Sequence, residues 1–112
     1  MANESETLKS GNVVQVTFAG SGGDWVWSTN GGYTGGGIKV RAIEWLPSAA
    51  NDILVVNEGG ADGPSIVHWK AGGISDSKQI TYGEGEWMKP YIDIDDCTFT
   101  TTTTTKVMFI LA

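Results

Sequence analysis

The chain has 112 residues, which is the size of one domain with a single small hydrophobic core. Its net charge is −6, from thirteen acidic and seven basic side chains, so it lacks the cationic face that nucleic acids and anionic lipids require. Its one cysteine, Cys97, excludes an internal disulfide. Neither a signal peptide nor an apolar run near the roughly 20 residues of a membrane span is present, so we expect synthesis and folding in a cytoplasm.

Composition and periodicity predict an all-β protein with a flexible N-terminal arm. Charged residues make up only 18% of the chain, while glycine (16) and tryptophan (5) are frequent. Residues 1–12 are polar and show no hydrophobic periodicity, so we interpret them as an arm that a partner orders. Residues 13–112 are expected to form one domain, and no ten-residue window in it shows helical spacing.

The predicted strands follow the arm at intervals of about ten residues, separated by glycine-rich turns. In 13–20, Val14, Val16 and Phe18 alternate with polar residues, which is typical of a half-buried strand. In 38–46 the phase of the alternation shifts, which predicts a bulge near Ala42. The remaining strands are expected at 24–29, 51–60, 64–73, 77–83, 86–99 and 106–112, with 51–60 central and forming a hairpin with 64–73, and with 86–99 broken by Pro90. Eight or nine such strands indicate an antiparallel β-sandwich or a jelly-roll-like barrel.

The stretch DIDDCTFTTTTTTKVMFILA, residues 93–112, allows three interpretations. A sugar-bearing threonine stalk is disfavoured because no proline accompanies the threonines, and threonine itself favours strands. We therefore expect a strand end, a turn and the next strand start, forming a hairpin. Asp93 and Asp95 would face outward and could share a calcium ion, but a solvated face is favoured. Cys97 is expected to be a small buried residue rather than a nucleophile.

Catalytic and cofactor motifs are weak throughout the sequence. His68 has no nucleophile beside it and is expected at the surface. The glycine-rich stretches GSGG and GGYTGGG lead into strand-like sequence, so they are interpreted as turns rather than phosphate-binding loops. A glycosidase would need two opposed acids, and the candidates Glu44, Glu58, Glu84 and Glu86 show no spacing that brings two together. We predict no enzyme activity, no cofactor and no metal site.

The five tryptophans are the residues that most suggest a binding function. Trp45 and Trp69 lie in core-like strands and are expected inside. Trp25 and Trp27 alternate between glycine loops, so they are expected on an exposed face, and Trp87 beside the GEGE turn is the best candidate for an interface rim. Tyr91, which follows Trp87 in the same segment, completes the predicted interface.

Over residues 38–112 the stretches IKVRAIEWLPSAANDILVVNEG, PSIVHW, WMKPYIDIDDCTF and KVMFIL resemble small all-β structural proteins of tailed phages. The resemblance implies a head decoration or cement protein on the capsid surface of a virion, with the major capsid protein or neighbouring virion subunits as partners. It also implies a homo-oligomer, a trimer or a dimer, and carries no catalytic residues.

Two alternative functions stay open beside the decoration protein. One is a carbohydrate- or receptor-binding module that uses Trp25, Trp27 and Trp87. The other is a head–tail connector or minor tail protein of the same virion class.

Overall fold

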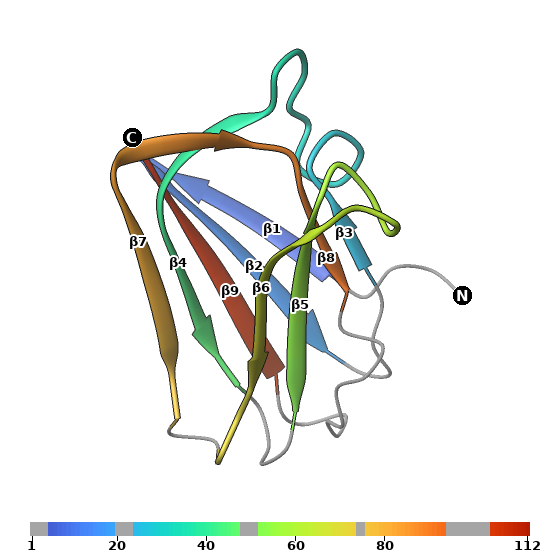
Figure 1. Ribbon diagram of the computed structural model, residues 1–112, viewed down its shortest axis with the longest axis vertical. Helices are drawn as coiled ribbons and strands as arrows, with labels where there is room; N and C mark the ends of the chain where they lie inside the picture. The colour runs from blue at the N-terminus through green and yellow to red at the C-terminus, as the bar shows by residue number, and fades with distance from the viewer. Residues whose placement is uncertain (1–4, 20–23, 48–51, 74–75, 94–103) are drawn as a thin grey trace.

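The computed structural model describes residues 5–19, 24–47, 52–73, 76–93 and 104–112. These residues form nine strands in two antiparallel sheets that pack face to face, and they contain no helix (Figure 1). The arrangement is a β-sandwich, which confirms the all-β prediction and selects the sandwich over the barrel.

The larger sheet has five strands in the order β1-β2-β9-β4-β7, and the smaller sheet has four in the order β3-β8-β5-β6. The five-stranded sheet contains β1 (Ser5–Ser10), β2 (Val13–Ala19), β9 (Thr104–Leu111), β4 (Ile38–Leu46) and β7 (Lys78–Met88). The four-stranded sheet contains β3 (Asp24–Val26), β8 (Pro90–Asp93), β5 (Ile53–Glu58) and β6 (Ser65–Lys70). As predicted, β5 is an interior strand of its sheet and forms an antiparallel pair with β6.

The core lies between the two sheets and is built from the inward positions of each strand. Val14, Val16 and Phe18 of β2 are all buried, as the alternation in the sequence predicts. Trp25 of β3 crosses to the opposite sheet and stacks on Phe109 of β9, with ring centroids 5.6 Å apart and an angle of 27° between the ring planes. The two sheets are therefore joined by aromatic packing at the centre of the domain.

Strand β7 bends where the sequence predicts a bulge in its neighbour β4. The pairing register between these strands shifts between Val40 and Ala42, and β7 passes through Gly83 and Gly85 with φ of 58° and 114°. Only glycine adopts these angles without strain, so the bend depends on them. Beyond it, the end of β7 turns across the end of the sandwich and leads into β8 of the other sheet (Figure 1).

Three predictions about strand boundaries and pairing are wrong. The expected arm over 1–12 contains β1, which pairs with β2 from Ser5↔Phe18 to Ser10↔Val13 across a two-residue turn. The strand expected at 77–83 does not end before 86, because β7 continues to Met88, whereas the break predicted at Pro90 is confirmed by the start of β8 there. The hairpin expected between 93 and 112 does not form from β8 and β9, because those strands lie in different sheets.

Candidate interaction surfaces

The prediction that Trp25 stands on an exposed face is wrong, because its side chain is 0% exposed. Its indole Nε1 donates a hydrogen bond to Thr7 Oγ1 of β1, at 3.0 Å, which satisfies the polar end of the ring. Trp25 is therefore a core residue, and it ties β3 to the first strand of the opposite sheet.

Trp87 is the most exposed large hydrophobic side chain of the described residues, at 66%. It lies near the end of β7, beyond the bend, and pairs in register with Lys39 of β4. Its neighbour Met88 points inward and is 5% exposed. The alternation of the strand thus places Trp87 on the outer side of the segment that crosses the end of the sandwich.

Two further aromatic residues lie at this same end of the sandwich. Trp27 and Tyr33, both half-buried, are linked through the backbone, where Tyr33 N donates to Trp27 O at 3.2 Å. Lys89 Nζ lies 5.7 Å from the Trp27 ring centroid, and Lys9 Nζ lies 4.3 Å from the Tyr33 ring centroid. Such contacts hold the ammonium groups over the ring faces. We call Trp27, Tyr33 and Trp87 the aromatic end of the sandwich.

The backbone around the aromatic end is held by hydrogen bonds at the ends of β3, β5 and β8 in the four-stranded sheet. Lys89 N donates to both carboxylate oxygens of Glu58, at 3.1 and 3.2 Å. Gly59 N donates to Lys89 O at 2.8 Å, and Trp27 N donates to Pro90 O at 3.2 Å. The segment that follows Trp87 is therefore anchored, so the exposed indole is presented on a supported backbone.

Tyr91 does not belong to the aromatic end. It lies on the outer face of the four-stranded sheet, in register with Val26 and Asn57, and its hydroxyl donates to Asp24 Oδ2. The predicted interface residues are thus distributed over three places: Trp27 and Trp87 at the aromatic end, Trp25 in the core, and Tyr91 on the smaller sheet.

The residues considered for catalysis or metal binding are also separated. His68 is exposed on the outer face of the four-stranded sheet, in register with Val55. Glu44 lies on the outer face of the five-stranded sheet, whereas Glu58 is engaged by Lys89 N at the aromatic end. In the described ranges, no three His, Cys, Asp or Glu side chains gather as metal ligands would. Asp95 and Cys97 lie outside the described residues.

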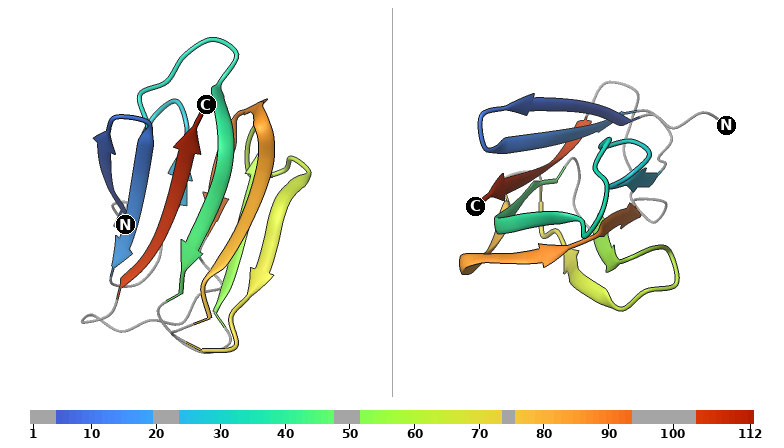
Figure 2. Two further views of the ribbon diagram at one scale, coloured as in Figure 1. Left: turned by 90° about the vertical axis from the view of Figure 1, so that its left-hand side faces the viewer. Right: turned by 90° about the horizontal axis from the view of Figure 1, so that it is seen from above.

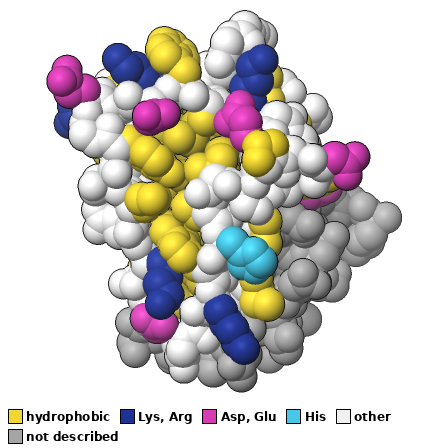
Figure 3. All heavy atoms as spheres, in the orientation of Figure 1, with side chains coloured by type: hydrophobic (Ala, Val, Ile, Leu, Met, Phe, Trp, Pro, Cys, Tyr) yellow, Lys and Arg dark blue, Asp and Glu magenta, His cyan; other side chains and the backbone are white. Residues whose placement is uncertain are grey.

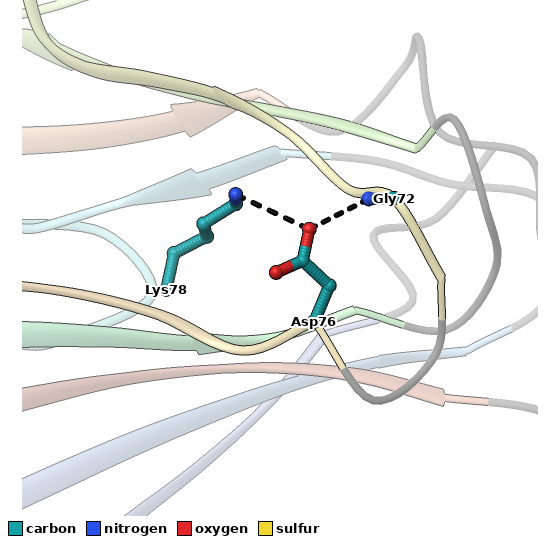
Figure 4. Close-up of polar contacts among 3 residues, drawn as sticks. All are labelled: Gly72, Asp76 and Lys78. Atoms are coloured by element: carbon teal, nitrogen blue, oxygen red, sulfur yellow. Dashed lines mark hydrogen bonds and ion pairs between the residues drawn. The ribbon is translucent and has the colours of Figure 1, made fainter.

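Among the described residues, Asp76 is the one carboxylate whose pKa is clearly shifted, and its contacts explain the shift as part of a turn (Figure 4). Gly72 N donates to Asp76 Oδ2 at 2.7 Å, and Lys78 Nζ lies 3.2 Å from the same oxygen. The backbone hydrogen bond, followed by the contact with Lys78, lowers the pKa of this carboxyl. The exposed side chain closes the connection between β6 and β7 and has a structural role.

A strip of hydrophobic side chains lies on the open side of the sandwich, between the edge strands β6 and β7 (Figure 3). Partly buried Ile66, Ile80 and Tyr82 belong to these strands and pack against the core. Tyr82 Oη is buried and has no hydrogen-bond partner among the described residues. Burial, with a smaller contribution from Glu86, raises the pKa of this phenol, so it stays protonated at neutral pH.

The outer face of the five-stranded sheet carries apolar side chains that were not predicted from the sequence. Leu8 and Leu46 on this face are 55% and 40% exposed, and Val13, Met108 and Ile110 between them are half-buried. The signal was present in VMFIL, residues 107–111, which is apolar at five consecutive positions. A strand with one solvated face alternates, so an unbroken apolar run indicates that both faces are covered or available for contact.

Comparisons with known proteins give no family. No family model and no curated protein matches the chain. A solved structure titled "CBM4 structure and function" is similar over 98% of this chain and 89% of that chain, with 11% sequence identity and a TM-score of 0.41. At that level of similarity no residue role is transferred from it. Within the described part of the chain, a helix capable of spanning a membrane is not found.

Proposed function

We propose that this chain is a non-enzymatic structural protein of a virion, a decoration or cement subunit that attaches to the assembled capsid through the aromatic end of the sandwich. The observation that carries the proposal is the exposure of Trp87 on an anchored backbone. Tryptophan is enriched among the few residues that dominate the energy of protein interfaces. An anchored backbone also loses little conformational freedom when the exposed indole binds.

The size of the contact suits a subunit that acts in many copies. A tryptophan side chain carries about 150–250 Å² of surface, so covering the 66% of Trp87 that is exposed gives roughly 2.5–4 kcal/mol at about 25 cal/mol per Å². That energy is modest for one site. A lattice in which each subunit links several neighbours adds such contributions, so weak single contacts produce a stable shell.

Copy number in purified particles tests this proposal first. Quantitative mass spectrometry of the virus that encodes the chain would count it against the major capsid protein. Hundreds of copies support decoration or cement, whereas about a dozen would assign it to a head–tail connector or minor tail position. Absence from the particle would refute the virion proposal.

The role of Trp87 is tested by rebinding to particles from which the protein has been removed. Trp87→Ala is expected to weaken attachment at least tenfold, which corresponds to about 1.4 kcal/mol or more. His68→Ala removes an exposed side chain from the outer face of the smaller sheet and serves as the matched control. Equal attachment of the two variants would contradict the assignment of the aromatic end.

A carbohydrate- or receptor-binding module is the second candidate, and the same exposed indole favours it, since a flat ring can stack on a sugar. Titration with a broad glycan panel, followed by tryptophan fluorescence, separates the two. A saturable change that Trp87→Ala abolishes supports glycan binding. If no glycan in the panel changes the fluorescence and the chain attaches to particles, the result supports the capsid proposal.

A further inference from the structure

The outer face of the five-stranded sheet is an open surface on the other side of the β4 bulge from Trp87. Figure 2 (left) shows β1, β2, β9, β4 and β7 side by side, with no described segment crossing them. An antiparallel sheet that faces water normally carries polar residues on that side. Here one row of outward positions is apolar instead: Val13 pairs with Ile110, and Ile110 pairs with Ala42 across three adjacent strands.

The pairing register places the apolar residues of this face on a diagonal. Met108 of β9 lies beside Gln15 and Glu44, and Lys106 lies beside Leu46. Val13, Met108 and Leu46 lie on the adjacent strands β2, β9 and β4. Each is displaced along the strands by one outward-facing position from the one before, so together they form an oblique stripe across the sheet. Lys106 and Glu44 stand on opposite sides of the stripe at equal spacing from it. We call Val13, Met108 and Leu46 the diagonal stripe.

From this arrangement we infer that the outer face of the five-stranded sheet binds a second copy of the chain, with the diagonal stripe as the two-fold axis. A two-fold axis in the plane of the contact, running along the stripe, places each stripe residue against its own counterpart. The same operation brings Lys106 of one copy over Glu44 of the other, twice. Leu8 of each copy then meets the region of Ile110 and Ala42.

The symmetry gives the residues of the diagonal stripe, Lys106 and Glu44 suitable partners. Apolar side chains meet apolar side chains, and the two charges meet opposite charges, as an isologous contact between identical surfaces requires. The strands of the two copies then cross at a large angle, which is one of the two usual ways that sheets pack face to face. A second copy is therefore the occupant that the face fits.

Charge and area also favour self-association here. The chain carries −6 overall, but the outward positions of β1, β2, β9 and β4 are not acidic: Lys106 and Glu44 lie beside the stripe, and the exposed Glu6, Lys39 and Arg41 lie farther from it. Two acidic molecules thus meet where their repulsion is weakest. Five strands about 4.8 Å apart and roughly 23 Å long give about 550 Å² per copy, or about 1,100 Å² in a dimer. A specific interface needs about 1,000 Å².

The inference does not rest on the proposed virion function and is tested on the full chain alone. Sedimentation equilibrium from micromolar concentrations to several hundred micromolar should show a mass twice the 11.9 kDa of the monomer at the upper end. A monomer throughout, or a trimer, would overturn it.

Variants on the face test the symmetry. Met108→Lys places two like charges on the axis and is expected to weaken dimerisation at least tenfold. His68→Lys adds the same charge to the outer face of the smaller sheet and should change nothing. Circular dichroism confirms that each variant is folded. A dimer that survives Met108→Lys unchanged would show that the contact lies elsewhere.

A charge exchange tests the pairing itself. Lys106→Glu alone should weaken the dimer about tenfold, since it places acid against Glu44 of the partner copy. Combining it with Glu44→Lys restores opposite charges across the axis and should return the dissociation constant to within about threefold of the original. Failure of the double variant to recover would refute the two-fold arrangement.

Discussion

Replacing Thr105 with valine tests a fully buried side-chain hydrogen bond that joins β4 to β9. Trp45 Nε1 donates to Thr105 Oγ1 at 2.7 Å, and Thr105 Oγ1 donates in turn to Leu46 O at 3.0 Å. Both Trp45 and Thr105 are 0% exposed. Valine has nearly the same shape but no oxygen, so Thr105→Val leaves the indole N–H buried without an acceptor.

The expected cost follows from that unsatisfied donor. A buried donor without a partner costs about 1–3 kcal/mol. The methyl group that replaces the hydroxyl returns at most about 0.8 kcal/mol of hydrophobic stabilisation. Because Leu46 is partly exposed, water can replace the bond to its carbonyl oxygen. We therefore expect the free energy of unfolding to fall by about 1–2 kcal/mol, which lowers the urea midpoint by roughly 1 M.

Urea unfolding followed by far-UV circular dichroism measures this change. Thr81→Val makes the same replacement at an exposed position on β7 and should stay within about 0.5 kcal/mol of the original chain. In a Trp45→Phe background, Thr105→Val should cost about 1 kcal/mol less, because phenylalanine has no N–H to leave unpaired. An unfolding free energy for Thr105→Val equal to or above that of the original chain would refute the reasoning.

Three further predictions concern the first strand, a glycine and a turn. Deleting residues 1–10 should lower the free energy of unfolding by about 2 kcal/mol or more, measured by urea unfolding, because β1 covers an edge of the sheet and accepts the Trp25 hydrogen bond; an unchanged midpoint would show that β1 is dispensable. Gly37→Ala, at φ 100° with its new Cβ pressed against Met88 O, should cost about 3 kcal/mol or more. Gly35→Ala, at φ 69° in open space, should cost only about 1–2 kcal/mol by the same assay, and equal losses would contradict the close contact. Because the folded-state pKa of Asp76 is lowered, its contribution to stability is present above its ordinary pKa of 3.8 and is lost as the pH falls below it. Thermal unfolding of Asp76→Asn between pH 2 and 6 should therefore show a shallower loss toward acid, and an unchanged slope would contradict this.

Local patterns located most strands and several of their details. The alternation of Val14, Val16 and Phe18 identified the buried side of β2, and the phase shift near Ala42 marked the bulge in β4. These features are readable because side-chain direction alternates with a period of two along the strand itself. The first strand was missed because SETLKS is polar, although Gly11 and Asn12 form a two-residue hairpin turn that could have indicated it.

The burial of the tryptophans shows a property that local sequence patterns do not determine. Trp25 and Trp87 both follow glycine-containing turns, and the sequence suggested that both are exposed. Trp25 is buried because β3 lies across the core from β9 and brings it against Phe109. Trp87 is exposed because the glycine bend carries the end of β7 across the end of the sandwich.

The sequence by itself determined an acidic, all-β domain, the approximate positions of its strands and the inward side of several of them. Only the tertiary structure decided the strand order, the passage from the larger to the smaller sheet between Met88 and Pro90, and the apolar outer face. Alternation and turn chemistry act between residues close in the chain. Pairs such as Val13↔Ile110 join its two ends, so they depend on how all the intervening strands pack.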